Sequence, residues 1–165
     1  MTVHPIAPVF DANSKILILG SFPSVRSREV GFYYGHPQNR FWKIISGICR
    51  ETLPYETEDK KSLLLKNGIA LWDVIGSCEI VGSSDTSIRN VKVNDISKIT
   101  NRADIKAVFL NGKTAEKYFV KYVSSQIKTE YYTLPSTSPA NAAYSYERLS
   151  DIWSENISRY IIKTV

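Results

Sequence analysis

The chain has 165 residues, of which 43% are hydrophobic and 12% aromatic, and its formal net charge is +5 at pH 7. This length and composition predict one globular domain over residues 1–165 and exclude a disordered or low-complexity protein. The positive charge favours a polyanionic partner, nucleic acid first, although no run of lysine and arginine dominates any segment.

The two cysteines, Cys49 and Cys78, lie far apart in the sequence and form no Cys-x-x-Cys pair. They cannot supply a four-cysteine zinc ribbon or iron–sulfur cluster, and we expect neither a metal nor another cofactor. The first ten residues lack a basic segment followed by an apolar stretch, and no segment approaches a membrane span. We therefore expect a cytoplasmic protein with reduced thiols.

The first part of the chain contains one buried strand and two helices by its apolar pattern. Residues 16–19 form a short apolar run that ends at Gly20, which is typical of a strand buried on both faces. A helix is predicted to begin at Pro37, because proline suits the first helical position and apolar residues follow at helical spacing over 41–48. A further helix is predicted over 57–66.

The rest of the chain continues the alternation of strands and helices. Apolar segments predict strands over 68–75, 106–112 and 129–136. Helical spacing predicts helices over 115–123 and 149–161. The alternation indicates an α/β fold, a three-layer α/β/α sandwich with a central, mostly parallel four-stranded sheet.

The residues that follow the predicted strands are the first candidates for a functional site. In open parallel sheets, ligands bind outside the carboxyl ends of the strands. The candidate positions are 20–24, Asp73, 111–113 and 135–141. Asp73 closes an apolar run, and its spacing fits a cap for the next segment as well as a site residue.

Two familiar kinds of site do not fit the sequence. Residues 111–114 read NGKT, like the end of a phosphate-binding P-loop, but Ala107 stands where that motif needs its first glycine. Lys113 can still contact a single phosphate. The two histidines, His4 and His36, are too few to support a metal site or a Ser–His–Asp triad, and we expect His36 to cap the helix that follows it.

The segment around the start of that helix carries an amide and three adjacent aromatic residues. Asn39 falls in the predicted first turn, where its amide lies at the positive end of the helix dipole or faces water. Phe32, Tyr33 and Tyr34 cannot all face one core, so at least one lines a surface or pocket, where its ring can stack on a base. Residues 134–144, LPSTSPANAAY, form either an ordered loop close to a ligand or a plain connection.

Together these segments resemble the uracil-DNA glycosylase superfamily. Residues 16–24, ILILGSFPS, match the position of its motif 1, and residues 136–142, STSPANA, match that of motif 2. Residues 35–45, GHPQNRFWKII, resemble the HPxNRFW segment of the mismatch-specific and thymine-DNA glycosylases. The resemblance extends from about Val9 to the C-terminus, and it implies the α/β/α fold of that superfamily.

Two positions depart from the pattern of most branches. Motif 1 usually carries Asp or Asn, which positions or activates water, and motif 2 usually opens with His or Asn; here Phe22 and Ser136 stand in those places. This combination is similar to the hypoxanthine-DNA glycosylase branch, family 6, where the asparagine of HPQNRFW, Asn39 here, is the catalytic residue. The resemblance implies a monofunctional, metal-independent enzyme that excises hypoxanthine, the product of adenine deamination, from deoxyinosine in DNA. A glycosylase for uracil or mismatched pyrimidines, and a protein that binds damaged DNA without cleavage, remain alternatives.

The resemblance also implies roles for individual residues. Asn39 would stabilise the leaving base or orient water. The base would be flipped out of the duplex into a pocket formed by Ser21, Phe22, Tyr34, Asp73 and Asn111. Within this pocket we expect Tyr34 to stack on the base and Asp73 to accept the N1–H of hypoxanthine, which adenine lacks. DNA would contact Arg26, Arg28, Lys113, Ser136, Ser138, Ala140 and Asn141, with one protein monomer on the DNA.

Overall fold

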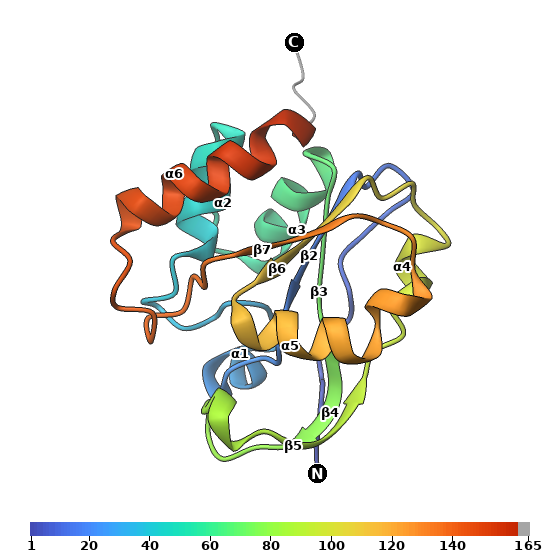
Figure 1. Ribbon diagram of the computed structural model, residues 1–165. Coiled ribbons are helices and arrows are strands. Elements are labelled where there is room, and N and C mark those ends of the chain that lie inside the picture. The colour runs from blue at the N-terminus through green and yellow to red at the C-terminus, as the bar shows by residue number, and fades with distance from the viewer. Residues whose placement is uncertain (162–165) are drawn as a thin grey trace.

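The centre of the fold is a four-stranded parallel sheet. The computed structural model describes residues 1–161 and orders these strands β3-β2-β6-β7 (Figure 1). The strands are β2 (Ile16–Gly20), β3 (Ile69–Asp73), β6 (Ala107–Asn111) and β7 (Tyr131–Leu134). Every residue of β2, β3 and β6 is buried, which explains the unbroken apolar runs. The predicted α/β fold with a parallel four-stranded sheet is confirmed.

Four longer helices connect and cover these strands. They are α2 (Phe41–Cys49), α3 (Thr57–Lys66), α5 (Lys113–Tyr122) and α6 (Tyr146–Ile157). The crossover from β2 to β3 and the crossover from β6 to β7 run in opposite directions along the sheet. Because such crossovers are right-handed, α2 and α3 cover one face of the sheet and α5 covers the other. Helix α6 packs beside α2 (Figure 1), which completes the three layers.

A second, antiparallel sheet lies beyond the main one and was not predicted. Its strands, in the order β1-β4-β5, are β1 (Thr2–Val3), β4 (Ile75–Glu79) and β5 (Arg89–Val93). The sequence shows little sign of these strands, because β5 reads RNVKV and β4 contains glycine and serine. Strand β4 begins two residues after β3 ends, so its pairing with β1 brings the N-terminus to the edge of the main sheet.

Two short helices were also missed by the apolar pattern. Helix α1 (Val25–Val30) directly follows the loop after β2, and α4 (Ser97–Thr100) lies before β6. The hydroxyl of Ser24 caps α1 by accepting the backbone N–H of Ser27 at 3.1 Å. Gly31 ends α1 with a φ of 77°, a conformation that glycine adopts without strain.

The prediction that a helix begins at Pro37 was wrong, because α2 begins at Phe41. Residues 36–39 form a turn instead, in which the N–H of Asn39 donates to the carbonyl of His36 at 2.9 Å. Proline suits the second position of such a turn as well as the start of a helix. His36 therefore caps this turn rather than the helix, since its Nδ1 accepts the N–H of Gln38 at 3.1 Å.

The other helices agree with their predicted positions, with shifts at the ends. Helix α3 matches the prediction over 57–66, and α5 begins at Lys113, two residues before the predicted start. Helix α6 begins three residues earlier than expected, at Tyr146, because Ser145 caps it by accepting the N–H of Arg148. It gives way to a 3-10 turn over Ser158–Tyr160.

Candidate active site

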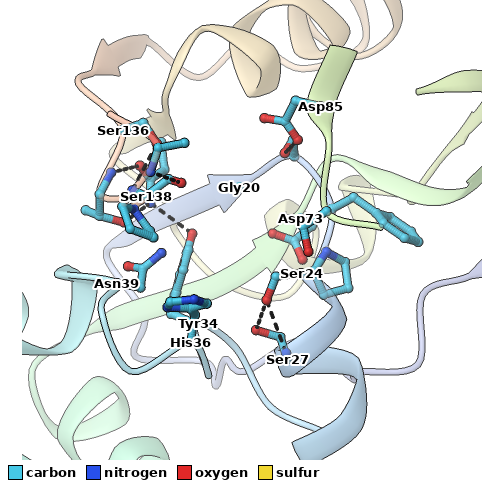
Figure 2. A pocket seen from close by; sticks show the side chains of 18 of the residues that line it. Gly20, Ser24, Ser27, Tyr34, His36, Asn39, Asp73, Asp85, Ser136 and Ser138 are labelled. Atoms are coloured by element: carbon cyan, nitrogen blue, oxygen red, sulfur yellow. Dashed lines mark hydrogen bonds between the residues drawn. The ribbon is translucent and has the colours of Figure 1, made fainter. Parts of the chain in front are cut away.

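A cavity of about 610 Å³ opens at the carboxyl ends of β2, β3 and β6 (Figure 2). The parallel register aligns these ends, with Gly20 paired to Asp73 and Leu19 paired to Leu110. The cavity lies between the loop after β2, the segment before α2, the β4–β5 connection and the loop after β7. Nine of the predicted site residues line it: Ser21, Phe22, Tyr34, Asn39, Asp73, Asn111, Ser136, Ser138 and Ala140.

Gly20 lets two polar groups converge beside the end of β2. A Cβ atom at Gly20 would lie 2.5 Å from Oδ1 of Asp73 and 2.9 Å from the hydroxyl oxygen of Tyr34. Any side chain here would displace both groups, so glycine is needed for their close approach. The carboxylate and the phenol therefore both lie beside Gly20 at one end of the cavity.

Asp73 is held from behind by His4, a residue for which the sequence predicted no role at the site. The Nε2 atom of His4 lies 2.7 Å from Oδ2 of Asp73, and the two side chains are only 3% and 5% exposed. The Nδ1 atom of His4 accepts the backbone N–H of Ile6 at 3.2 Å. With Nδ1 accepting, the imidazole carries its proton on Nε2 and donates it to Asp73. No local motif could reveal this contact, because β1 and β4 must pair to create it.

Asn39 presents a fixed amide to the cavity. Its Oδ1 accepts the backbone N–H of Phe41, the first residue of α2, at 2.9 Å. This bond identifies the carbonyl side of the amide and leaves the NH₂ group as the side that faces the cavity (Figure 2). Among the described residues the NH₂ group makes no hydrogen bond to protein. Asn39 thus offers a hydrogen-bond donor to a ligand.

Tyr34 and Asn111 form a buried network with the loop after β7. The Nδ2 group of Asn111 donates to the Tyr34 hydroxyl at 3.1 Å and to Oγ1 of Thr137 at 3.0 Å, while its Oδ1 accepts the Thr137 N–H at 3.0 Å. Both ends of the Asn111 amide are therefore bonded within the protein, so Asn111 fixes Tyr34 and the loop. Burial and the Asp73 carboxylate both raise the pKa of Tyr34, and its hydroxyl keeps its proton.

The ring of Tyr34 has one face covered by protein. It stacks on Phe41 with centroids 4.1 Å apart and an angle of 21° between the rings. Tyr34 also has a φ of 52°, an uncommon backbone conformation for a residue with a bulky side chain. Strain of this kind is stored where the surrounding structure fixes a side chain for function. The ring lines the cavity, where a flipped base can stack on it.

Arg40 organises the loop after β7 and was not singled out from the sequence. Its guanidinium donates to the carbonyl oxygens of Ser138 at 2.8 Å and Asn141 at 3.1 Å, and also to that of Tyr144. Its backbone N–H donates to the carbonyl of Thr137 at 3.1 Å. The planar guanidinium has several N–H donors and can bond to these carbonyl oxygens at the same time. Arg40 therefore joins the segment that carries Asn39 to the loop on the opposite wall of the cavity.

A second carboxylate, Asp85, enters the cavity from the β4–β5 connection. The hydroxyl of Ser21 lies 3.4 Å from its Oδ1. The residue is exposed, but the protein around its carboxyl group partly desolvates it, and this desolvation is the largest cause that raises the pKa of Asp85; hydrogen bonds from Thr114 and Ser21 oppose the rise. Asp85 was missed because its segment, SSDTS, looks like an ordinary polar turn. Only the pairing of β4 and β5 turns it towards the end of β2.

Phe22 packs against His4 rather than facing open solvent. Its side chain is 9% exposed, and its ring meets the imidazole edge-on with centroids 5.9 Å apart. The guanidinium of Arg28 lies 5.6 Å from the Phe22 centroid and donates to the carbonyl of Gly82 at 2.9 Å. Phe22 thus lies between the cavity and the buried His4 ring, while Asp73 itself lines the cavity.

Four of the residues expected to contact DNA lie outside the cavity lining. Arg26 pairs with Glu29 at 3.6 Å on the exposed surface of α1, and Lys113 is exposed at the start of α5. The amide of Asn141 donates to the carbonyl of Ser136 at 3.0 Å, within its own loop. The fourth residue is Arg28. Their contacts with DNA stay predictions.

Comparison with known proteins gives the family. The model of the family described as the uracil DNA glycosylase superfamily matches residues 7–157. The chain belongs to this superfamily. It is 35% identical over 154 residues to a Methanosarcina barkeri protein named hypoxanthine DNA glycosylase, covering 92% of this chain and 96% of the relative. A relative of the same name from Methanosarcina acetivorans is 36% identical over 145 residues, with coverages of 87% and 90%.

A solved structure agrees with this membership. A solution NMR structure from Methanosarcina acetivorans, reported for a candidate uracil DNA glycosylase, superposes with a TM-score of 0.81 at 32% identity. The superposition covers 94% of this chain and 96% of that chain. Motif 1, the HPQNRFW segment and motif 2 of this superfamily member line three sides of one cavity. The matched range begins after His4, which therefore lies outside the family match.

Two further properties bear on what this glycosylase-superfamily member can bind. Within residues 1–161, no three His, Cys, Asp or Glu side chains gather in a group that could hold a metal ion. No helix in the same part of the chain has the length and apolar character that spanning a membrane requires. The cavity is instead lined by amide, hydroxyl, carboxylate and aromatic groups, which suit a nucleotide ligand.

Proposed function

We propose that this chain is a monofunctional DNA glycosylase that excises hypoxanthine from deoxyinosine and leaves an abasic site. The observation that carries the proposal is the opposition of Asn39, an amide donor, and Asp73, a carboxylate acceptor, in one cavity. Both Methanosarcina relatives carry the name hypoxanthine DNA glycosylase, which supports the choice of base. We further propose that the chain acts as a single-domain cytoplasmic monomer without a metal.

Asp73 provides the selectivity for the deaminated base. Hypoxanthine carries a proton on N1, whereas adenine presents a lone pair there. The free Oδ1 of Asp73 accepts a proton donor but repels a lone pair, and a lone pair facing a carboxylate leaves both acceptors unsatisfied. Ligand cavities typically enclose about 300–1,000 Å³, so the space here accommodates a flipped purine.

Asn39 stabilises the charge that develops as the base departs. Hydrolysis breaks the bond between C1′ and N9, the bonding electron pair leaves with the purine, and water supplies the oxygen that bonds to C1′. A proton from that water is released, and the purine gains one as it leaves. The NH₂ group of Asn39 donates to a purine acceptor in this step. A preorganised donor of this kind contributes roughly 10²–10³ in rate.

The remaining residues hold the flipped nucleotide and the DNA. Tyr34 stacks on the base with the face that Phe41 leaves open. Asn111 and Arg40 fix the positions of Tyr34 and the loop after β7. The backbone phosphates contact Arg26, Arg28, Lys113 and the loop residues Ser136, Ser138, Ala140 and Asn141. The side chains of Ala140 and Asn141 fill the gap left by the base.

Uracil excision is the second candidate function, because uracil, like hypoxanthine, presents a ring N–H beside a carbonyl group. Asp73 alone does not separate the two bases. Phe22 argues for hypoxanthine, since the position that usually carries an acid or amide in uracil-cutting branches is closed by a phenyl ring against His4. A protein that binds damaged DNA without cleavage would have no use for the fixed donor of Asn39.

One experiment tests these alternatives together. The protein is incubated in EDTA with oligonucleotides that contain deoxyinosine, deoxyuridine or deoxyxanthosine, and abasic sites are then cleaved with alkali. We expect strand cleavage at deoxyinosine. Cleavage at deoxyuridine alone would support the pyrimidine glycosylase, and no cleavage of any substrate would support the binding protein.

A further inference from the structure

We propose that His4 is the positioning residue that makes Asp73 a selective acceptor for the flipped base. This inference rests on the function proposed above and extends it to a residue that does not line the cavity. His4 lies behind Asp73, outside the range matched by the family model and remote in sequence from the three motifs. Its contact with Asp73 spans 69 positions of the chain.

The pairing of β1 with β4 brings His4 to this place. Thr2 pairs with Cys78 and Val3 with Ser77 in antiparallel register. The N–H of His4 continues the pairing by donating to the carbonyl of Gly76 at 2.8 Å. Gly76 lies three positions after Asp73, so a residue opposite it is within reach of the end of β3. Strand β1 therefore places the imidazole of His4 beside the site.

The hydrogen bonds of His4 determine where its proton lies. The Ile6 N–H points at Nδ1 with a separation of 3.2 Å, so a proton on Nδ1 would face another proton. The single proton of the neutral ring is on Nε2, and it is donated to Oδ2 of Asp73 at 2.7 Å. The carboxylate is thereby anchored through Oδ2, and Oδ1 is directed to the position beside Gly20 where the base is read.

The aromatic residue in motif 1 fits the same arrangement. Phe22 meets the imidazole edge-on, and the ring of Tyr33 lies 6.0 Å from it on another side. These rings exclude water from the hydrogen bond between His4 and Asp73, which makes the bond stronger than it would be in solvent. An acid at position 22 would place a second negative charge near the His4 ring. The phenyl ring carries no charge and excludes water from the pair.

Three variants separate positioning from a general structural role. His4→Leu removes the hydrogen-bond donor, whereas His4→Gln keeps an N–H donor near the position of Nε2. Val3→Ala is the matched control, because Val3 is 67% exposed on the same strand. Single-turnover rates are measured on deoxyinosine and on deoxynebularine, whose purine lacks both the 6-oxo group and the N1 proton. Thermal unfolding is recorded for each variant.

We expect His4→Leu to slow release of hypoxanthine by roughly tenfold, the effect of one charge-assisted hydrogen bond. The rate on deoxynebularine should not fall, since this base presents a lone pair at N1 and gains nothing from the acceptor. His4→Gln should restore most of the deoxyinosine rate, and Val3→Ala should match the wild type. An unchanged deoxyinosine rate in His4→Leu, or an equal loss on both substrates, would overturn the proposal.

A measurement on the unaltered protein covers the case in which His4→Leu does not fold. The chain has two histidines, so ¹⁵N spectra of histidine-labelled protein contain few ring signals, and His4→Gln assigns them. We expect the nitrogen shifts of His4 to report a proton on Nε2 and none on Nδ1. A proton on Nδ1 would refute the positioning role. If the wild type releases no hypoxanthine at all, the proposed function fails, and that result is seen before any variant is compared.

Discussion

Arg40 donates a hydrogen bond from Nη2 to the carbonyl oxygen of Ser138 at 2.8 Å, across 98 positions of the chain. Through this bond and its neighbours, the segment that carries Asn39 and the loop after β7 form one unit around the cavity. The loop that we propose to contact DNA is therefore joined directly to the segment that positions Asn39.

Replacing Arg40 with lysine should weaken this unit. Lysine keeps the charge, but it is a point donor and cannot span the carbonyls of Ser138, Asn141 and Tyr144. We expect Arg40→Lys to lower the free energy of unfolding by about 2–3 kcal/mol and to slow hypoxanthine release. Urea denaturation and single-turnover assays measure the two effects, with Arg102→Lys, an exposed site, as the control. Wild-type stability in Arg40→Lys would contradict this account.

Two replacements of Asn39 both remove its NH₂ donor, but only one of them keeps the oxygen that accepts the Phe41 N–H. Asn39→Ala removes both the hydrogen bond to Phe41 and the donor, whereas Asn39→Asp keeps an oxygen for that bond and removes the donor. Both variants should lose roughly 10²–10³ in the rate of hypoxanthine release, and Asn39→Asp should retain more of the stability. Gln38→Ala, at the exposed neighbouring position, controls for disturbance of the turn. Full activity in Asn39→Asp would remove the amide donor from the mechanism.

Asp73→Asn tests the basis of selectivity. An amide at this position can present either a donor or an acceptor, so it no longer repels the N1 lone pair of adenine. We expect the preference for deoxyinosine over deoxyadenosine to weaken, mainly through slower release of hypoxanthine. The measurement is the ratio of single-turnover rates on matched oligonucleotides. An unchanged ratio would show that Asp73 does not read N1.

Asp85 should destabilise the fold slightly at neutral pH, because its carboxyl group is partly desolvated although the residue is exposed. Desolvation raises the pKa of its carboxyl group above 3.8, so the folded state binds this proton more tightly than the unfolded state. Its contribution to stability therefore becomes unfavourable as the pH rises from 3.8 through the raised pKa. We expect Asp85→Asn to be more stable than wild type at pH 7 and to lose this advantage near pH 3, as measured by denaturant unfolding at both pH values. An equal difference at both pH values would refute this.

The retention of such a carboxylate in the cavity has a functional explanation. Groups with perturbed pKa values cluster at sites of chemistry, where stability is given up for function. We therefore expect Asp85→Asn to slow hypoxanthine release while it stabilises the fold. A variant that is more stable and fully active would show that Asp85 has no part in excision.

Much of the main sheet could be predicted from the sequence, and the reason is burial. Strands β2, β3 and β6 are covered on both faces, so each appears as an unbroken apolar run. The residues that end these strands, Gly20, Asp73 and Asn111, must then meet at one edge. The second sheet could not be found this way, because β5 is exposed on much of its length and carries polar residues.

The wrong prediction of a helix start at Pro37 has a different cause. Proline fixes φ at a value that suits both a helix and a turn, so the residue alone does not decide between them. The side chain of Asn39 decides it, because its oxygen accepts the Phe41 N–H and begins α2 two residues later. That one hydrogen bond also turns the donor side of the amide to the cavity.

By itself, the sequence determined the parallel sheet and the place of Asp73 at its carboxyl edge, because hydrophobic burial follows from residue order. The resemblance of the three motifs to the superfamily then implied that Asn39 and Tyr34 belong to the same site. Only the tertiary structure decided what holds those residues in place. His4, Arg40 and Asp85 are single polar residues in unremarkable segments. Strand pairing and loop packing bring them to the site over long sequence separations, and hydrogen-bond geometry, which residue order does not contain, then defines their roles.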